Sequence, residues 1–319
     1  MKIFLPFLLC APLLWGSVTQ PLTLEAGAGY TYDRMNEKAL TNTGDETLVY
    51  EEKYTNHVTQ TILTLRTIQR DFFALATAGY GYLGHKDMEQ RWGTQNLLFS
   101  PDTRYTTQGH NWQTLGLIGY AVNVIPEHFH KFIITPVGGF GGFWKNISRH
   151  SPHPNPDSSN NSTLYPGQLE KRTKDVWYGP TLGIIFEGDP WHGAWVRVGY
   201  SFYGFKIHHK TFARIEEKRY TDGSLTLDHI ITLKEKLGTG KGSGHFGQIQ
   251  FIYELSKHWQ VAVLSEIHYF YSDKKRHMHK TQWTETIFPS ESVSEIKGKD
   301  KFHARWYTLS FLGEIAYRF

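Results

Sequence analysis

Hydrophobic and polar residues alternate over the last eleven positions of the chain, 309–319. One parity holds Leu309, Phe311, Gly313, Ile315, Tyr317 and Phe319, and the other holds Ser310, Leu312, Glu314, Ala316 and Arg318. A side-chain period of two predicts a β-strand with one apolar face and one polar face. A strand between lipid and a polar lumen has this pattern, with aromatic residues at the level of the lipid headgroups. A buried strand of a β-sandwich shares the alternation and is the alternative interpretation.

Comparable segments recur along the chain and predict ten strands in all. The expected ranges are 22–33, 57–69, 72–82, 107–123, 132–144, 175–187, 193–207, 244–255, 259–272 and 302–319. In the first of them, Leu22, Leu24, Ala26, Ala28, Tyr30 and Tyr32 share one face. The fourth is ambiguous, because both of its faces are apolar. Four glycines in the fifth, Gly138, Gly139, Gly141 and Gly142, are typical of the bends that barrel closure requires.

The connections between these strands alternate between long and short. The long ones are 34–56, 84–106, 145–174, 208–243 and 273–301, and each is predicted to be a polar loop, with a hairpin possible only in 208–243. Ordinary domains rarely carry five such loops, whereas membrane barrels have short periplasmic turns and long extracellular loops. The predicted fold is therefore all-β, a ten-stranded antiparallel transmembrane β-barrel with both termini on the periplasmic side.

The physics of the bilayer supports the same fold. In hydrocarbon, an unpaired backbone amide costs several kcal/mol, so amphipathic strands span a membrane only when the sheet closes. The chain has 319 residues, a formal net charge of +4 and 15% aromatic residues, and it contains no uncharged apolar run of 18 residues. A helical membrane protein is therefore excluded. The absence of any block of like charges gives no reason to expect a nucleic-acid partner.

The N-terminus predicts a secretory signal peptide. A basic start at Met1-Lys2 precedes an apolar segment, 3–16, that is too short to cross a bilayer, and small residues follow at Gly16 and Ser17. The predicted organisation is a signal peptide over 1–20 and an outer-membrane barrel over 21–319. The expected location is the bacterial outer membrane, with its lipid and the barrel-assembly machinery as partners. Because Cys10 is the only cysteine, the mature chain is expected to have no disulfide.

Charged residues on the inward parity are the candidate site. The expected lumen-lining residues are Glu25, Arg66, Arg197, Glu254, Glu266, His268, Glu314 and Arg318. Ten strands enclose a lumen only slightly wider than that of eight-stranded barrels, which side chains nearly fill. Opposite charges in this space are expected to pair and partly plug it, and the alternative is that they select ions in a pore. The C-terminal residues Phe311, Ile315, Tyr317 and Phe319 resemble the assembly signal of outer-membrane barrels.

Ten strands also resemble the omptin proteases, which place an aspartate pair opposite a His-Asp pair above the membrane. The candidate segments here are Gly84-His85-Lys86-Asp87 and Asp228-His229. The first has no aspartate pair, and the second has its two residues adjacent rather than alternating. We therefore expect no enzymatic activity. Histidine pairs at His128/His130, His277/His279 and His208/His209 lack a completing carboxylate or cysteine, so no metal and no cofactor is expected.

Two functions remain open from the sequence. One is a porin-like passage of ions or small solutes through a narrow charged lumen. The other is a surface adhesin or receptor, in which the barrel anchors long loops that bind a host or environmental ligand. The segment 177–184, Trp-Tyr-Gly-Pro-Thr-Leu-Gly-Ile, together with the Phe-terminated last strand, resembles the Protochlamydia outer membrane protein group. That resemblance implies a porin-like barrel over most of the mature chain, although fold alone does not determine function.

Overall fold

The structure is a computed structural model that describes part of the chain. It describes residues 18–42, 47–94, 97–99, 106–124, 131–150, 162–165, 169–191, 193–221, 224–237, 240–272, 276–287 and 290–319. Side chains are described for 18–36, 53–84, 108–124, 131–148, 172–191, 193–210, 212, 240–272 and 303–319. The predicted signal peptide lies outside the described residues up to position 17.

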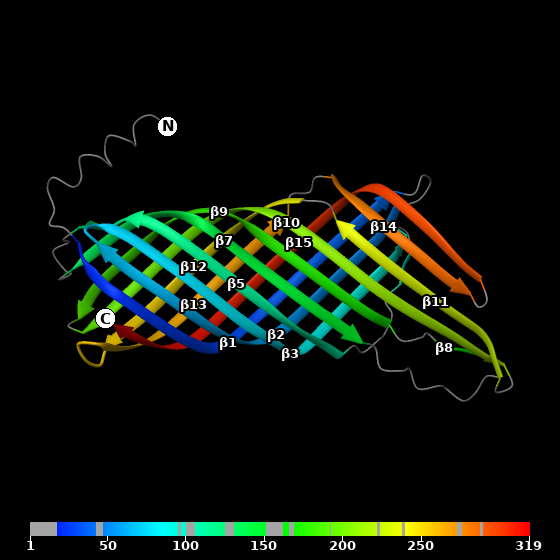
Figure 1. Cartoon of the computed structure of the whole chain (residues 1–319), viewed down its shortest axis with the longest axis horizontal. Helices are drawn as coiled ribbons and strands as arrows, with labels where there is room; N and C mark the ends of the chain where they lie inside the picture. Colours follow the sequence, from blue (N-terminus) through cyan, green and yellow to red (C-terminus); the bar gives the residue numbers. More distant parts are fainter. Residues whose placement is uncertain are drawn as a thin grey trace.

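The described residues form one closed antiparallel sheet (Figure 1). The ring consists of β1 (Gln20–Asn42), β2 (Thr47–Gln69), β3 (Phe72–Thr94), β5 (Thr106–Tyr120), β7 (Phe132–His150), β9 (Leu169–Trp191), β10 (Ala194–Thr221), β12 (Gly240–Glu254), β13 (Trp259–Ser272) and β15 (Ser290–Arg318). Each strand pairs with the next, and β15 pairs with β1 from Thr23↔Arg318 to Leu40↔Lys301. This pairing closes the ring and confirms the predicted ten-stranded barrel.

The ring continues at one end through two further strands, β11 (Ser224–Leu237) and β14 (Arg276–Ile287). β10 pairs with β12 along 194–207 and with β11 along 210–221. β11 then pairs with β14, and β14 with β15. Thus β11 takes the place of β12 in the ring, and β14 takes the place of β13. We call this end of the barrel the extended end. Two short strands lie there: β4 (Leu97–Phe99) pairs with β3, and β8 (Ser162–Tyr165) pairs with β10.

The opposite end, the turn end, holds the short connections and the C-terminus (Figure 1). Arg70 and Asp71 join β2 to β3 with φ values of 49° and 72°, the backbone of a two-residue hairpin turn. The connection from β5 to β7 includes β6 (Val122–Asn123), which pairs with β7. The amide of Phe319 donates to the carbonyl of Leu22 at 3.0 Å, so the last residue lies beside the first strand.

Four of the five segments predicted as polar loops, 34–56, 84–106, 145–174 and 273–301, are mostly strand where the structure describes them, and this part of the prediction is wrong. β1 runs nine residues past the expected end at 33, and β15 begins at Ser290 rather than near 302. The reason is that backbone pairing between neighbouring strands continues beyond the lipid, where neither face needs to be apolar. Alternating hydrophobicity therefore ends before the strands do. The hairpin expected within 208–243 is present, with Ile215 opposite Ile231.

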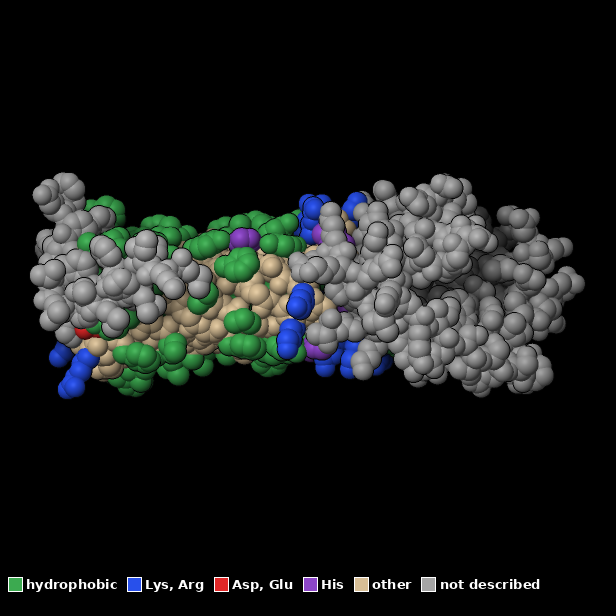
Figure 2. Space-filling view, turned by 90° about the horizontal axis from the view of Figure 1, so that it is seen from above, with side chains coloured by type: hydrophobic (Ala, Val, Ile, Leu, Met, Phe, Trp, Pro, Cys, Tyr) green, Lys and Arg blue, Asp and Glu red, His purple; other side chains and the backbone are tan. Residues whose placement is uncertain are grey.

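The two faces of the barrel follow the predicted alternation. Large apolar side chains are exposed on the outside of each of the ten ring strands among the described side chains, including Leu63, Phe140, Leu182, Phe251 and Ile315. On β5 the even positions face out, with Ile118 59% exposed, and the odd positions face in, with Leu117 4% exposed. Figure 2 shows the outward residues as a hydrophobic band on the turn-end half of the molecule. No helix among the described residues is long and apolar enough to cross a membrane.

Candidate functional site

Two layers of buried inward side chains cross the described lumen. We call the layer nearer the turn end the charge layer; it consists of Glu25, Arg66, Glu187, Arg197, Gln250 and Glu314. The aromatic layer lies toward the extended end and consists of Phe143, Trp177, Tyr203, Phe205, Phe246, Phe270 and Trp306. All of these side chains are buried.

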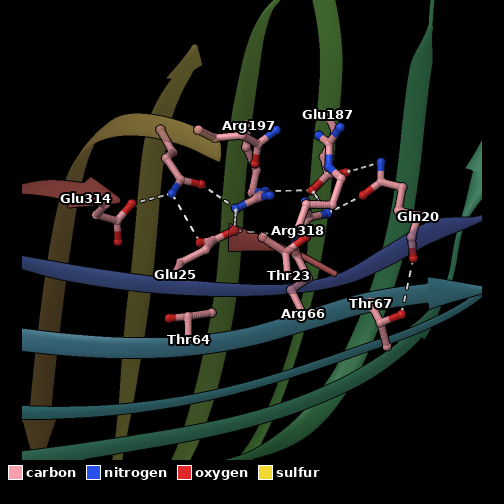
Figure 3. A network of polar contacts seen from close by, with 12 residues as sticks. Gln20, Thr23, Glu25, Thr64, Arg66, Thr67, Glu187, Arg197, Glu314 and Arg318 are labelled. Carbon is pink, nitrogen blue, oxygen red and sulfur yellow. Dashed lines mark hydrogen bonds and ion pairs between the residues drawn. The ribbon is translucent and has the colours of Figure 1, made fainter. Parts of the chain in front are cut away.

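Glu187 is the centre of the charge layer (Figure 3). Its Oε1 accepts hydrogen bonds from Arg197 Nε at 2.6 Å and from Arg66 Nη1 at 3.0 Å. Arg66 Nη1 also donates to Oε2 of Glu187 at 3.2 Å and to Gln20 Oε1 at 2.5 Å. β2, β9 and β10 thus contribute one charge each to a single buried cluster. Such charges are stable in a dry interior only because each is paired and hydrogen-bonded.

Two further carboxylates extend the charge layer across the lumen (Figure 3). Glu25 on β1 lies 3.4 Å from Arg197 Nη1 and 3.7 Å from Arg66 Nε. Gln250 on β12 donates through Nε2 to Glu25 and to Glu314, and its Oε1 accepts from Arg197. Glu25 and Glu187 therefore share two guanidinium groups, and the amide of Gln250 links Glu25 to Glu314.

The mouth of the turn end contains a cavity of about 480 Å³. Arg66, Glu187 and Arg318 are among its lining residues. Arg318 donates to Glu254 at 2.8 Å, and both side chains are more than a quarter exposed. The cavity opens toward the turn end, and the charge layer forms its inner wall.

A cavity of about 40 Å³ lies between the charge layer and the aromatic layer. Tyr203, Glu266 and His268 line it, and the Tyr203 hydroxyl, Glu266 Oε2 and both ring nitrogens of His268 have no hydrogen-bond partner. The nearest charge contact is 3.8 Å, between His268 Nε2 and Glu266 Oε2. A cavity of this size has room for a few water molecules, which would supply partners to these polar atoms within an otherwise largely apolar lining.

The aromatic layer is held together by ring contacts and one buried ion pair. Phe143 on β7 packs against Phe270 at a centroid distance of 4.7 Å and against Trp306 at 5.9 Å. Toward the extended end, Lys145 donates to Asp33 at 2.5 Å and lies over the Trp306 ring. Asp33 also accepts from the Trp306 indole nitrogen at 2.6 Å. Its carboxylate is thereby satisfied within an otherwise apolar layer.

The structure places all eight predicted lumen residues on the inner side of the barrel, but it separates them into groups. Glu25, Arg66, Arg197 and Glu314 belong to the charge layer. Glu254 and Arg318 pair at the turn end, and Glu266 and His268 lie between the layers. Their role as selectivity residues of a pore stays a prediction.

Three central residues were missed by the sequence analysis. Glu187 falls on the inward parity of β9, so the alternation could have found it. Asp33 falls on the inward parity at the last position of the expected strand 22–33, and Lys145 was assigned to the loop 145–174 because polar residues follow it. Only the continuation of β7 to His150 places Lys145 in the lumen.

The other predicted residues have these locations. Phe311, Ile315 and Phe319 are exposed on the outer face, and their role in assembly stays a prediction. His208 faces outward and contacts the Tyr178 hydroxyl at 3.1 Å, whereas His209 faces inward and pairs with Asp175. Adjacent strand residues point to opposite faces, so these two histidines do not form one ligand pair.

Several candidate site residues have side chains outside the described part of the structure. His128 and His130 are not described, and neither are the side chains of His85, Asp87, Asp228, His229, His277 and His279. Among the residues that are described, no three His, Cys, Asp or Glu side chains form a group that could hold a metal ion.

The fold and lumen define a ten-stranded antiparallel β-barrel filled by a charge layer and an aromatic layer. This fold is similar to that of the outer membrane protease OmpT from Escherichia coli, with a TM-score of 0.58 and 9% identity over 97% of this chain and 100% of OmpT. The translocator domain of the autotransporter NalP from Neisseria meningitidis has a TM-score of 0.32 and 10% identity over 94% of this chain and 89% of its own. The toluene transporter TbuX from Ralstonia pickettii has a TM-score of 0.32 and 8% identity over 97% of this chain and 91% of its own.

The comparison with OmpT shows the fold alone, a barrel that resembles bacterial outer-membrane proteins. No protein-family model and no curated protein matches the chain. The resemblance to the Protochlamydia group therefore stays a prediction.

Proposed function

We propose that this chain is a non-enzymatic outer-membrane barrel with a closed lumen, which acts as an adhesin or receptor through its extended end. The observation that carries the proposal is the filling of the described lumen at two successive levels. Glu25 and Arg197 in the charge layer are 4% and 3% exposed, and Phe270 in the aromatic layer is fully buried. Side chains that are this inaccessible to water leave no aqueous path of the kind that larger barrels provide.

The extended end supports the second half of the proposal. β10 has 28 residues and β15 has 29, whereas a tilted strand needs about 9–11 residues to cross the hydrocarbon. The ring of strands therefore continues well beyond the hydrophobic band. Figure 2 shows this band on the turn-end half of the molecule. By the usual orientation of such barrels, the turn end and the termini face the periplasm and the extended end faces outward. A projecting sheet is suited to presenting a binding surface.

Conductance in a planar bilayer tests the closed lumen. We expect the folded full-length chain to give no stable current steps, because ions would have to displace paired, buried charges in one layer and packed rings in the next. A porin inserted under the same conditions is the positive control. Stable, ion-selective steps from the folded chain would reject the proposal and support the porin-like passage of solutes instead.

A further inference from the structure

Lysine side chains gather on the outer surface of three neighbouring strands, just beyond the hydrophobic band. They are Lys174 on β9, Lys206 and Lys210 on β10, and Lys241 on β12, and all four are exposed. Figure 2 shows Lys, Arg and His side chains gathered at the edge of the hydrophobic surface that lies toward the extended end. We call these four residues the lysine patch.

The lysines of the patch are paired with each other across the strands. Lys206 is directly opposite Lys241 in the β10–β12 register, and Lys210 is directly opposite Lys174 in the β9–β10 register. Like charges directly opposite each other destabilise a sheet. The described outward side chains of β9, β10 and β12 at this level include no carboxylate that would relieve this repulsion. Within the described part of the chain, none of the four lysines has an ion pair.

The surface next to the patch on the same strands carries a tyrosine and then, closer to the turn end, apolar side chains. Tyr178 is opposite Lys206, and its hydroxyl contacts His208 at 3.1 Å with the rings stacked. Closer to the turn end, Leu182 is 71% exposed and Phe202 43% exposed. Tyrosines at this position mark the level where hydrocarbon meets headgroups. The patch thus lies at headgroup height, with an acyl-chain surface directly beneath it.

We propose that the lysine patch binds the phosphate groups of a phosphorylated lipid in the outer leaflet, whose acyl chains lie against β9, β10 and β12. An anion at this position converts two like-charge pairs into a cationic clamp, and basic clusters beside transmembrane segments bind anionic headgroups in this way. The inference goes beyond the proposed function. It requires the barrel to lie in a membrane with this end outward, and it does not depend on a closed lumen.

The test measures binding of lipid A carrying both phosphates to the full chain folded in zwitterionic detergent. We expect the variant Lys206→Gln/Lys241→Gln to bind roughly 20- to 30-fold more weakly, since each lysine near a headgroup contributes about 1 kcal/mol. The matched control is Lys131→Gln/Lys257→Gln, which removes two exposed lysines at the turn end and should bind as the parent does. Folding of each variant is checked by its heat-modifiable migration in gels. If the first variant does not fold, Lys174→Gln/Lys210→Gln takes its place.

Two further arms identify the ligand. Dephosphorylated lipid A should bind far more weakly than the phosphorylated form, and inorganic phosphate at millimolar concentration should not displace it. Equal binding of both lipids, or unchanged affinity in the folded lysine-patch variant, would overturn the proposal. Full displacement by inorganic phosphate would also overturn it, because the site would then recognise a free anion rather than a lipid.

Discussion

At the scale of single residues, Glu187 has the most consequential position in the lumen. It accepts hydrogen bonds from Arg66 and Arg197, and all three side chains are at least 92% buried. A buried ion pair is weak evidence of net stabilisation, but removing one partner leaves the remaining charges without compensation. Glu187 therefore matters chiefly because two arginines depend on it.

Replacement of Glu187 by Gln should destabilise the folded barrel by about 3–5 kcal/mol, because two buried guanidinium groups lose their shared carboxylate. The loss is measured as a shift in urea-induced unfolding of the chain in detergent micelles. Glu254→Gln is the matched control, since Glu254 pairs with Arg318 at the partly exposed turn end and should cost less than about 1 kcal/mol. Equal losses in the two variants would show that the charge layer is not held by Glu187.

At the scale of elements, close approach between strands limits which residues the barrel tolerates. Gly139 on β7 faces β5 so closely that a Cβ atom would lie 1.9 Å from the carbonyl oxygen of Gly116. Gly116 itself is different, since its nearest contact for a Cβ would be 4.0 Å. The structure thus has no room for a side chain at Gly139 but leaves room for one at Gly116.

Gly139→Ala should therefore lower the yield of folded barrel and destabilise what folds by about 1–3 kcal/mol, the usual range for forced backbone shifts. Gly116→Ala should fold as the parent does. Both are compared by refolding into detergent and counting the heat-modifiable fraction. If Gly139→Ala refolds as well as Gly116→Ala, the close approach of β5 and β7 is not a constraint on the fold.

At the scale of the whole molecule, the lumen is closed at two successive levels, and four strands, β9, β10, β12 and β15, contribute side chains to both. The charge layer uses β1, β2, β9, β10, β12 and β15, whereas the aromatic layer adds β7 and β13. Weakening one layer leaves the other in place.

Phe143→Ala tests this arrangement. Loss of a buried ring that contacts Phe270 and Trp306 should destabilise the barrel by about 3–5 kcal/mol, and conductance should stay absent because the charge layer is intact. Phe140→Ala on the same strand is the control, since Phe140 is 55% exposed on the outer face and leaves no internal cavity. Current steps in Phe143→Ala alone would mean that the aromatic layer is the sole barrier.

The sequence by itself determined the ten strands of the ring, their order and the face on which most described side chains lie. This was possible because the period of two is a local property of the extended backbone, so Glu25, Arg66 and Arg197 could be assigned to the lumen one strand at a time. The even count and the short turns then followed from the spacing of the alternating segments.

Only the tertiary structure decided which inward residues meet and where the strands end. Glu187 and Arg66 are 121 residues apart on strands that are not neighbours, and their contact depends on the register of every pair around the ring. The strands at the extended end are held by backbone pairing with their neighbours, which leaves no hydrophobic pattern to detect. Strand register also decides that Lys206 lies opposite Lys241, and this pair is seen only when β10 and β12 are placed side by side.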